Sequence, residues 1–351
     1  MKKILIMLLV LILAASITPF IGIGCKAEGA VEKTTVAATE AAEEVAKEDF
    51  SGKKVCFVIP TTGAFWIIPM EAKIEKELTE AGVEYIHFDS QFQLETSVSQ
   101  LEEAIEIEPD VIILHVLDTK AYSPGIKKAY EKGIPVVLTL SEVDEEANKL
   151  LTSNVFIDYY VEAEMAAELL VDGMKEKFGD DLSGKKIICQ SAPSTDPVAI
   201  ARQGGFETKL EEIAPEIEIL EVQVIDTWQK DESIEKMEAA LQKYPQIDGG
   251  YGHTDTIAVG LATAADDAGR VGDMVVVGID GTIDGFTAIE AGIMYGTVLQ
   301  SPLVTADEVL NVVFKILKGE EVPKLINVPF YKIKLEDLEN YVIEDPPRLK
   351  E

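Results

Sequence analysis

The chain has 351 residues, of which 47% are hydrophobic and 27% are charged. This much apolar material can form sizeable cores, which excludes a wholly disordered protein, and the length suggests two domains. The 63 acidic residues outnumber the 31 basic ones, and the net charge is −32. Such a charge disfavours nucleic-acid binding, which needs a basic surface, and attraction to anionic lipid headgroups. We interpret the acidity as a solvated surface.

The N-terminus has the pattern of an export signal. Lys2-Lys3 precedes an apolar run over residues 4–23, which is the order of charge and hydrophobicity in a secretory signal and is also long enough to span a membrane. The run ends in Gly-Ile-Gly immediately before Cys25, and this ending resembles a bacterial lipobox. Residues 1–24 are therefore predicted to be a signal peptide, and Cys25 to be the lipidated first residue of the mature chain. Plain cleavage and an uncleaved anchor stay open as alternatives.

The segment that begins at Cys25 is predicted to be a tether. Residues 25–52 are dominated by Ala, Glu, Thr and Lys and show no apolar stripe with which a helix could pack. A segment of this composition is expected to be solvated and to connect the lipid to the folded body.

The remaining cysteines, Cys56 and Cys189, each lie in an apolar run. We predict two buried free thiols rather than a disulfide. The three histidines, His87, His115 and His253, show no metal-site spacing with the cysteines. We therefore predict no metal and no cofactor.

Strand and helix patterns alternate along the rest of the chain. The strands are nearly all apolar, which is typical of a parallel sheet covered on both faces, and Gly82 and Gly133 follow predicted helices as C-terminal stops. The alternation predicts two doubly wound α/β units in tandem, the second starting near residue 158. The predicted strands are 55–59, 83–88, 111–116, 135–140, 186–190, 217–225, 249–252, 274–279 and 295–300, and the predicted helices are 71–81, 94–106, 121–132, 162–178, 199–213, 231–244, 255–268 and 285–291.

Aromatic residues follow two of these strands, at the edge where such sheets bind ligands. Phe65 and Trp66 come after the first strand, and Trp228 comes after the strand at 217–225. Rings in these loops could stack on a flat or sugar-like ligand. The alternative is that one or more of them cover the core.

Polar side chains stand at the same edge of the second unit. Asp280 follows the strand at 274–279, Gln300 ends the strand at 295–300, and Arg202 lies in the first turns of a helix that faces the same edge. An arginine opposite a carboxylate suits a hydroxyl-bearing ligand, although Asp280 could instead cap the following helix. No nucleophile elbow, Walker-type phosphate loop or Gly-rich dinucleotide motif is present in the sequence, so we predict that the protein is not an enzyme.

A series of short segments occurs in order between residues 53 and 335: Phe65-Trp66, Asp89-Ser90-Gln91, Pro109-Asp110, Ile134-Pro135-Val136-Val137, Arg202-Gln-Gly-Gly-Phe206, Thr254-Asp255 with Ala258 and Gly260, Val277-Gly278-Ile279-Asp280-Gly281-Thr282, and Lys318-Gly319-Glu320. Together they resemble the periplasmic sugar-binding proteins of bacterial ABC importers, of the ribose and galactose type. The resemblance covers essentially the whole chain after the tether.

The resemblance implies an α/β fold of the periplasmic binding protein type I, with two doubly wound parallel-sheet domains joined by three hinge crossovers. It implies a protein outside the cytoplasm that captures a sugar-like ligand, a monosaccharide, by closing around it, and that delivers it to an ABC permease. With the lipid anchor, the protein would be a monomer attached to the membrane of the cell envelope. The implied N-terminal lobe is 53–155 with 301–330, the implied C-terminal lobe is 156–300 with 331–351, and the hinges fall near 154–157, 300–303 and 329–332.

The resemblance also implies roles for single residues. Phe65 and Trp66 fall on the aromatics that sandwich the sugar from one side, and Trp228 falls on the opposing aromatic. The hydrogen-bonding set of the second domain falls on Arg202, Asp280 and Gln300.

Other positions depart from the family pattern. The family often has Asn at Gly63 and Asp near Leu140-Ser141, and it commonly has Asn at Tyr159 and at Thr254. His115 replaces a polar residue at the end of the third strand, where it either faces the cleft or is a satisfied strand-end residue. A ring-shaped ligand with hydroxyl groups is still expected, but neither ribose nor galactose is specified.

Rival functions were weighed against this interpretation. A transcriptional regulator of similar architecture would need a helix-turn-helix where this chain has its export signal. A sensory receptor, or a protein of the same fold that captures a nucleoside or an autoinducer, stays open. A cell-surface hydrolase also stays open, because the many acidic residues could include a catalytic pair.

Overall fold

The computed structural model describes residues 48–63, 66–343 and 346–350. The predicted signal peptide, Cys25, most of the predicted tether and Phe65 lie outside these residues. Within them, no helix combines the length and the apolar character that a membrane span requires.

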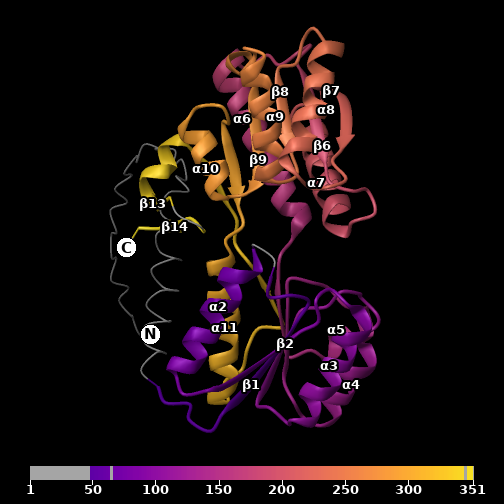
Figure 1. Ribbon diagram of the computed structural model, residues 1–351, viewed down its shortest axis with the longest axis vertical. Helices are drawn as coiled ribbons and strands as arrows, with labels where there is room; N and C mark the ends of the chain where they lie inside the picture. Colours follow the sequence, from indigo (N-terminus) through magenta and orange to yellow (C-terminus); the bar gives the residue numbers. More distant parts are fainter. Residues whose placement is uncertain (1–47, 64–65, 344–345, 351) are drawn as a thin grey trace, which may run out of the picture. The chain divides into compact units, whose positions relative to one another are not determined.

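The first domain is built on a six-stranded sheet in which every pair of neighbours is parallel, in the order β11-β5-β4-β3-β1-β2. Alternate residues of each strand face opposite cores. Val55 and Phe57 pack under α2 and α11, whereas Cys56 and Val58 pack under α3 and α4 (Figure 1). The elements are β1 (Lys54–Ile59), α2 (Ile67–Glu80), β2 (Glu84–Asp89), α3 (Leu94–Glu106), β3 (Val111–Leu114), α4 (Ser123–Glu131), β4 (Val136–Thr139), α5 (Glu145–Leu150), β5 (Ser153–Phe156), α11 (Pro302–Lys318) and β11 (Leu325–Asn327).

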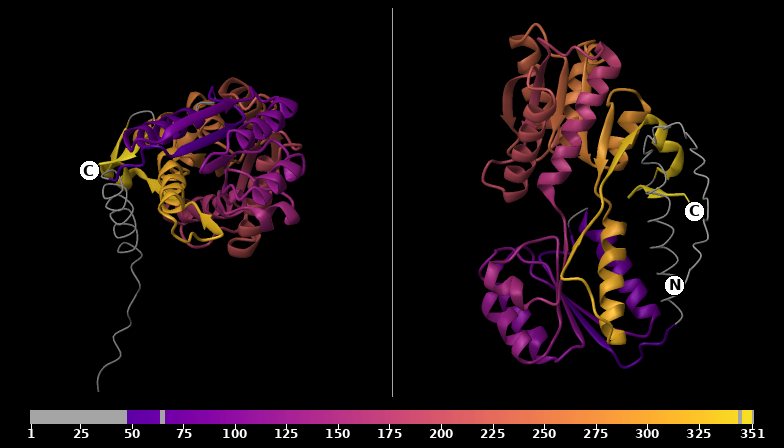
Figure 2. Two further views of the ribbon diagram at one scale, coloured as in Figure 1. Left: turned by 90° about the horizontal axis from the view of Figure 1, so that it is seen from below. Right: turned by 180° about the vertical axis from the view of Figure 1, so that it is seen from behind.

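The second domain repeats the plan, with its strands in the order β12-β10-β9-β8-β6-β7 and only β12 antiparallel to its neighbour. Helices α6 and α7 cover one face, and the view from behind in Figure 2 brings α6 to the front. Helices α8, α9 and α10 cover the other face. The elements are α6 (Tyr159–Phe178), β6 (Lys186–Ser191), α7 (Pro197–Ile213), β7 (Glu218–Val224), α8 (Lys230–Lys243), β8 (Gly249–Gly252), α9 (Asp255–Asp267), η1 (Val271–Asp273), β9 (Val275–Asp280), α10 (Ile283–Glu290), β10 (Gly296–Leu299), β12 (Tyr331–Lys334), η2 (Leu335–Asn340) and the short pair β13 (Tyr341–Val342) and β14 (Arg348–Leu349).

The chain passes between the two sheets three times, after β5, after β10 and after β11. Two parallel sheets, each with helices on both faces, and three crossovers confirm the predicted fold class. The predicted helix at 94–106 and the strand at 249–252 have the observed limits, and most other predicted elements are displaced by a few residues.

The largest displacement is at α2, predicted to begin at residue 71 but observed to begin at Ile67. Pro69 lies within the first turn, where a backbone N–H has no partner to lose, so the proline is tolerated. The predictions omitted β5, whose Ser-Asn-Val-Phe sequence lacks an apolar run. They also omitted α11, although Ser301 caps that helix and Pro302 occupies its first turn.

The same local structure precedes the first strand of each sheet, β1 in the first domain and β6 in the second. Asp49 accepts the Ser51 amide at 2.9 Å, and Asp181 accepts the Ser183 amide at 3.0 Å. Each segment continues with Gly-Lys-Lys into the first strand of its sheet, and the glycine has a positive φ of 88° at Gly52 and 75° at Gly184. The first lysine of each segment then pairs with an aspartate that precedes a neighbouring strand, in the contacts Lys53–Asp110 at 2.8 Å and Lys185–Asp248 at 3.1 Å.

Of two adjacent glycines in α7, Gly205 sets how closely this helix approaches α6. A Cβ at Gly205 would lie 2.1 Å from the backbone oxygen of Tyr160, whereas a Cβ at Gly204 would meet only the Tyr160 ring, at 3.4 Å. The first distance is a severe clash with backbone and the second is ordinary contact. Gly205 is therefore required for the close packing that places Arg202.

We expect Gly205→Ala to lower the free energy of unfolding by roughly 1–3 kcal/mol or more, because α7 must move away from α6. Gly204→Ala is the matched control, and it should be neutral or stabilise by roughly 0.5–1 kcal/mol, because alanine favours a helix interior. Urea denaturation of both variants measures the difference. Equal stability of the two variants would contradict the proposed role of Gly205.

Candidate functional site

The centre of the candidate site is Arg202, whose side chain is buried at the carboxyl edge of the second sheet, with 3% of the residue exposed. Its Nη1 donates to the backbone oxygen of His253 at 2.7 Å, and its Nε donates to Oε2 of Glu162 at 3.0 Å. Its Nη2 lies 2.9 Å from the same Glu162 oxygen and donates to Asp280 Oδ1 and Gln300 Oε1, both at 3.1 Å. The structure thus brings together the three predicted polar residues and adds Glu162.

Local structure at the start of α7 positions Arg202. Asp196 caps this helix by accepting the Val198 amide at 2.8 Å, and Pro197 occupies the first turn. The close approach at Gly205 then brings the arginine onto the first turn of α6, where Glu162 lies. The ring of Tyr159, also on that turn, lies 5.6 Å from the guanidinium carbon.

Asp280 ends β9 in an unusual backbone conformation. Its φ is 114°, a region that L-residues rarely adopt, and such strain is often found at functional sites. The helix after it is capped by Thr282, which accepts the Gly285 amide at 3.1 Å. The alternative that Asp280 is the helix cap is therefore wrong.

Thr254 and Asp255 stand at the start of α9. Thr254 caps this helix through its hydroxyl, which accepts the Ile257 amide at 3.2 Å. Asp255 is wholly buried and accepts the Thr297 hydroxyl at 2.6 Å and the Thr282 amide at 2.7 Å. Burial raises the pKa of Asp255 to about 7, with a further increase from Asp280, against the lowering effect of these hydrogen bonds.

Arg202 therefore contacts two of three buried carboxyl groups, Glu162 and Asp280, and Asp255 lies behind them without contacting it. Burial raises the pKa of Glu162 to about 8 despite the opposing effect of Arg202, and burial also raises the pKa of Asp280. Burial alone would lower the pKa of Arg202, but Glu162 and Asp280 raise it above its ordinary value. Arg202 therefore keeps its positive charge, whereas the protonation of the carboxyl groups can change with pH.

Sequence reasoning did not find Glu162 or Asp255 as site residues. Asp255 appeared within a family segment, so its place beside Thr254 was the available signal. Glu162 gave no signal, because one more glutamate in the first turn of a helix is normally a solvated residue that favours the helix dipole.

The two tryptophans differ in their surroundings. Trp66 is half-buried, packs against the core of the first domain, and donates from its indole Nε1 to the backbone oxygen of Gln300 at 3.0 Å. It therefore covers the core and also meets the second crossover. Trp228 is half-buried with a φ of 60° and packs against none of the hydrophobic cores of the described residues.

His115 follows β3 and is half-buried, with its Nδ1 atom buried and without a hydrogen-bond partner among the described residues. The alternative of a satisfied strand-end residue is therefore wrong for this atom. Burial lowers the pKa of His115 to about 4, so the ring is neutral at physiological pH. His253 contrasts with it, because its Nδ1 accepts the Ala192 amide at 3.2 Å and its Nε2 lies 2.8 Å from Gln203 Oε1.

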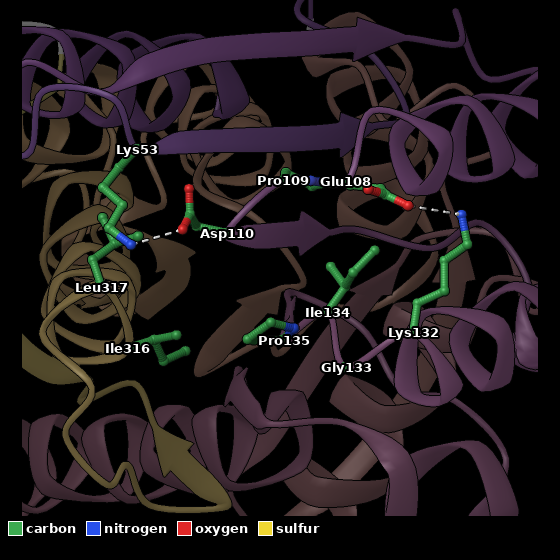
Figure 3. A pocket seen from close by; sticks show the side chains of 10 residues that line it. All are labelled: Lys53, Glu108, Pro109, Asp110, Lys132, Gly133, Ile134, Pro135, Ile316 and Leu317. Carbon is green, nitrogen blue, oxygen red and sulfur yellow. Dashed lines mark hydrogen bonds and ion pairs between the residues drawn. The ribbon is translucent and has the colours of Figure 1, made fainter.

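A pocket of about 470 Å³ in the first domain lies away from this site (Figure 3). Its walls come from the segments before β1, β3 and β4 and from the end of α11, so it opens at the amino ends of the strands. The Lys53–Asp110 ion pair stands at its edge. Ligands of open parallel sheets bind at the opposite edge, so we do not assign the ligand to this pocket.

Both cysteines outside the N-terminal segment are buried and free, as predicted, and burial raises the pKa of the Cys56 thiol to about 11. Among the residues that the structure describes, no cluster of three or more His, Cys, Asp or Glu side chains could hold a metal ion.

The fold and the polar residues at the carboxyl edge of the second sheet are typical of a two-domain α/β protein that binds a solute. A family model described as periplasmic binding protein domain matches residues 55–321. The chain belongs to this family. Membership confirms that the protein is a solute-binding protein rather than an enzyme, and that it acts outside the cytoplasm.

Relatives and solved structures agree with this assignment. The chain is 26% identical to the ribose import binding protein of Bacillus subtilis, over 83% of this chain and 90% of that protein. It is 28% identical to a xylitol-binding protein of Mycolicibacterium smegmatis, over 68% of this chain and 65% of that protein. The structure of an ABC transporter solute-binding protein from Actinobacillus succinogenes with bound D-allose matches with a TM-score of 0.70 and 22% identity, over 82% of this chain and 100% of that chain.

Removal of the central cation tests this arrangement. We expect Arg202→Met to lower the free energy of unfolding by roughly 3–5 kcal/mol, because Asp280 is left buried without a cation and Glu162 and the His253 carbonyl lose their buried hydrogen-bond donor. The loss should be larger at alkaline than at acidic pH, since a carboxyl group can take up a proton when its partner is removed. Urea denaturation across pH measures both effects.

Lys209→Met is the matched control on the same helix. Its partner, Glu212, is 64% exposed, so solvent screens the pair and this change should cost far less than Arg202→Met. Similar losses in the two variants would show that the Arg202 network does not stabilise the fold.

Proposed function

We propose that the protein captures a monosaccharide between its two domains and delivers it to the permease of an ABC importer. The observation that carries this proposal is the cluster of Arg202, Asp280 and Gln300 at the carboxyl edge of the second sheet, next to the indole of Trp66. Relatives named for ribose and xylitol, and a fold neighbour with bound D-allose, support a sugar or polyol as the ligand.

The chemistry of this edge suits several hydroxyl groups on one ring. Asp280 accepts hydrogen bonds from hydroxyls, and the Gln300 amide both donates and accepts. The Arg202 donors are largely occupied by protein acceptors, so we assign this residue chiefly the task of orienting Asp280 and Gln300. Aromatic faces then cover the apolar faces of the sugar. The residues proposed to line the site are Phe65, Trp66, His115, Tyr159, Arg202, Trp228, Thr254, Asp280 and Gln300.

Capture would follow from hinge closure. We place the two lobes at 53–155 with 301–330 and at 156–300 with 331–351, as the sequence predicted. Bending at the three crossovers would bring the lobes together, and a ligand that binds the closed form more tightly shifts the population toward it.

A lipid anchor completes the proposal. Removal of residues 1–24 would leave Cys25 as a lipidated first residue, and residues 25–52 would tether the binding domains to the membrane of the cell envelope. One acyl chain gives only marginal membrane binding, so stable attachment needs more than one chain.

Tryptophan fluorescence tests ligand capture without an added probe, because the chain has only two tryptophans, Trp66 and Trp228. D-ribose, D-allose and xylitol should be titrated into the wild type and into each single Trp→Phe variant. Closure should remove both indoles from water, so the emission of both variants should change at saturation. Mass spectrometry of small molecules released on denaturation extends the search beyond these three compounds.

Asp280→Ala is the companion variant, and it should weaken binding at least about tenfold, the effect of losing roughly 1.4 kcal/mol of binding energy. Asp284→Ala is the control, because Asp284 is exposed in the first turn of α10. Equal affinity of the two variants would remove Asp280 from the site. Saturating ligand with no change in either single-tryptophan variant would show that the site lies elsewhere.

Cys25→Ala tests the anchor. The wild-type protein should fractionate with membranes, and the variant should either be released or remain as the uncleaved precursor, which migrates more slowly in gel electrophoresis. Labelling with a radioactive fatty acid should be lost in the variant. A variant that fractionates, migrates and labels like the wild type would contradict lipidation at Cys25.

A further inference from the structure

Glu162 is wholly buried beside the candidate site, with no exposed surface. Both of its contacts with Arg202 are made by one oxygen, Oε2, at 3.0 Å from Nε and 2.9 Å from Nη2. The other oxygen, Oε1, is buried and has no hydrogen-bond partner among the described residues. A fully ionised carboxylate in this position would leave half of its charge without a donor.

The groups around Glu162 carry more negative than positive charge. Among the described residues that surround Glu162, Arg202 is the one full cation, because His253 accepts the Ala192 amide through Nδ1 and burial lowers its pKa to about 3. The lysines of β12 do not help, since they pair with acidic residues further along α6. The titratable and charged groups that interact with Glu162 are Arg202 on α7, Asp280 at the end of β9, Asp255 at the start of α9, Tyr251 on β8 and Tyr159 on α6 itself.

If all three carboxyl groups were ionised, two buried negative charges would remain uncompensated. Hydrogen-bond donors favour the ionised form of a carboxyl group. Asp255 accepts from Thr297 and Thr282, and Asp280 accepts from Arg202. Asp280 also accepts from Arg202 on one oxygen, but it is 8% exposed. Glu162 has no exposed surface, and its Oε1 is buried without a donor, so Glu162 is the least stabilised as an anion.

We propose that Glu162 is a positioning residue for ligand binding: it holds Arg202 toward Asp280 and Gln300, and it carries a proton at neutral pH. The positioning role rests on the proposed function of the site, whereas the proton does not. A proton on Glu162 at neutral pH agrees with the pKa of this carboxyl group, which burial raises to about 8.

The protonation state of Glu162 affects how Arg202 shares its donors. Nη2 has two hydrogens but three oxygen neighbours, on Glu162, Asp280 and Gln300. A neutral carboxyl group is the weaker acceptor, so Asp280 and Gln300 receive more of this donation. Loss of the proton to solvent would draw Nη2 toward Glu162 and loosen the two ligand-binding side chains. Affinity should therefore fall as the pH rises above the pKa of Glu162.

The first test compares the thermal stability of ligand-free wild-type protein with that of Glu162→Gln across pH. A carboxyl group with a folded pKa of about 8, against about 4.3 when unfolded, destabilises the fold progressively as the pH rises between these values. Glu162→Gln lacks this effect and keeps an acceptor for Arg202. The melting temperature of the variant minus that of the wild type should therefore increase with pH, and Glu164→Gln on the same helix is the matched control that should show no such trend.

A decrease of this difference with rising pH would mean that Glu162 is an ordinary ionised partner of Arg202 and would overturn the proposal. A constant difference would reduce Glu162 to a packing role and would overturn it as well.

The second test does not depend on the folding of Glu162→Gln. In wild-type protein labelled with ¹³C at the glutamate Cδ, one resonance should titrate with a midpoint near the pKa of about 8, far above the ordinary value of about 4.3. Burial also raises the pKa of Glu77 and of Glu308, so Glu77→Gln and Glu308→Gln identify their signals. Absence of a further resonance with so high a midpoint would contradict the proposal.

The third test addresses positioning. The ligand is whichever of D-ribose, D-allose and xylitol binds the wild type. Its dissociation constant from the wild type should rise about tenfold between about pH 7 and about pH 9, as expected when one proton is lost near pH 8. Glu162→Gln should bind with the same affinity at both pH values, and an equal pH dependence in the two proteins would refute the positioning role. If no sugar binds, the proposed function fails, while the first two tests still decide whether Glu162 holds a proton.

Discussion

A guanidinium group without contact to water must find acceptors for its donors, because an unpaired buried charge is costly. Arg202 finds them on four separate segments: the first turn of α6, the segment after β8, the end of β9 and the residue after β10. Several local features follow from this one requirement. Gly205 permits the approach of α7 to α6, and Asp280 holds a backbone conformation that few L-residues adopt. The site is thus a consequence of how the second domain buries one cation.

The same network lies close to the passages between the domains. Glu162 follows the first passage by a few residues, and Gln300 lies in the second. Tyr159 and Trp66 connect the Arg202 network to the first domain, because both pack against the core of that domain. The Trp66 indole also donates to the Gln300 backbone at 3.0 Å. The Arg202 network is therefore connected to residues beside two of the three passages between the domains.

The fold could be predicted because apolar strands alternate with helices, and that pattern survives in any single sequence. Asp280, Gln300 and Arg202 could be found because the carboxyl ends of parallel strands bind ligands. Glu162 could not, because its burial depends on α7 packing against α6, a contact between segments about 40 residues apart in the chain. A capping role for Asp280 stayed open as an alternative because Asp and Thr are both good caps, and the choice of Thr282 depends on backbone geometry. Sequence patterns thus located the edge but not the charge balance within it.

The charge of the whole chain and the charge of the site obey different rules. Most of the 63 acidic residues can be hydrated, so their negative charge mainly keeps the protein soluble. Asp255, Asp280 and Glu162 are removed from water, and there each ionisation must be matched by a nearby cation or avoided by keeping a proton. The first strands of the two sheets also follow equivalent turns, at Asp49 and Asp181, yet the polar groups identified at the carboxyl edges of the sheets differ. His115, at that edge of the first domain, is neutral, whereas the second domain gathers an arginine and three carboxyl groups. The two domains therefore differ in chemistry at the carboxyl edges of their sheets, while they share their architecture at the amino ends and in the cores.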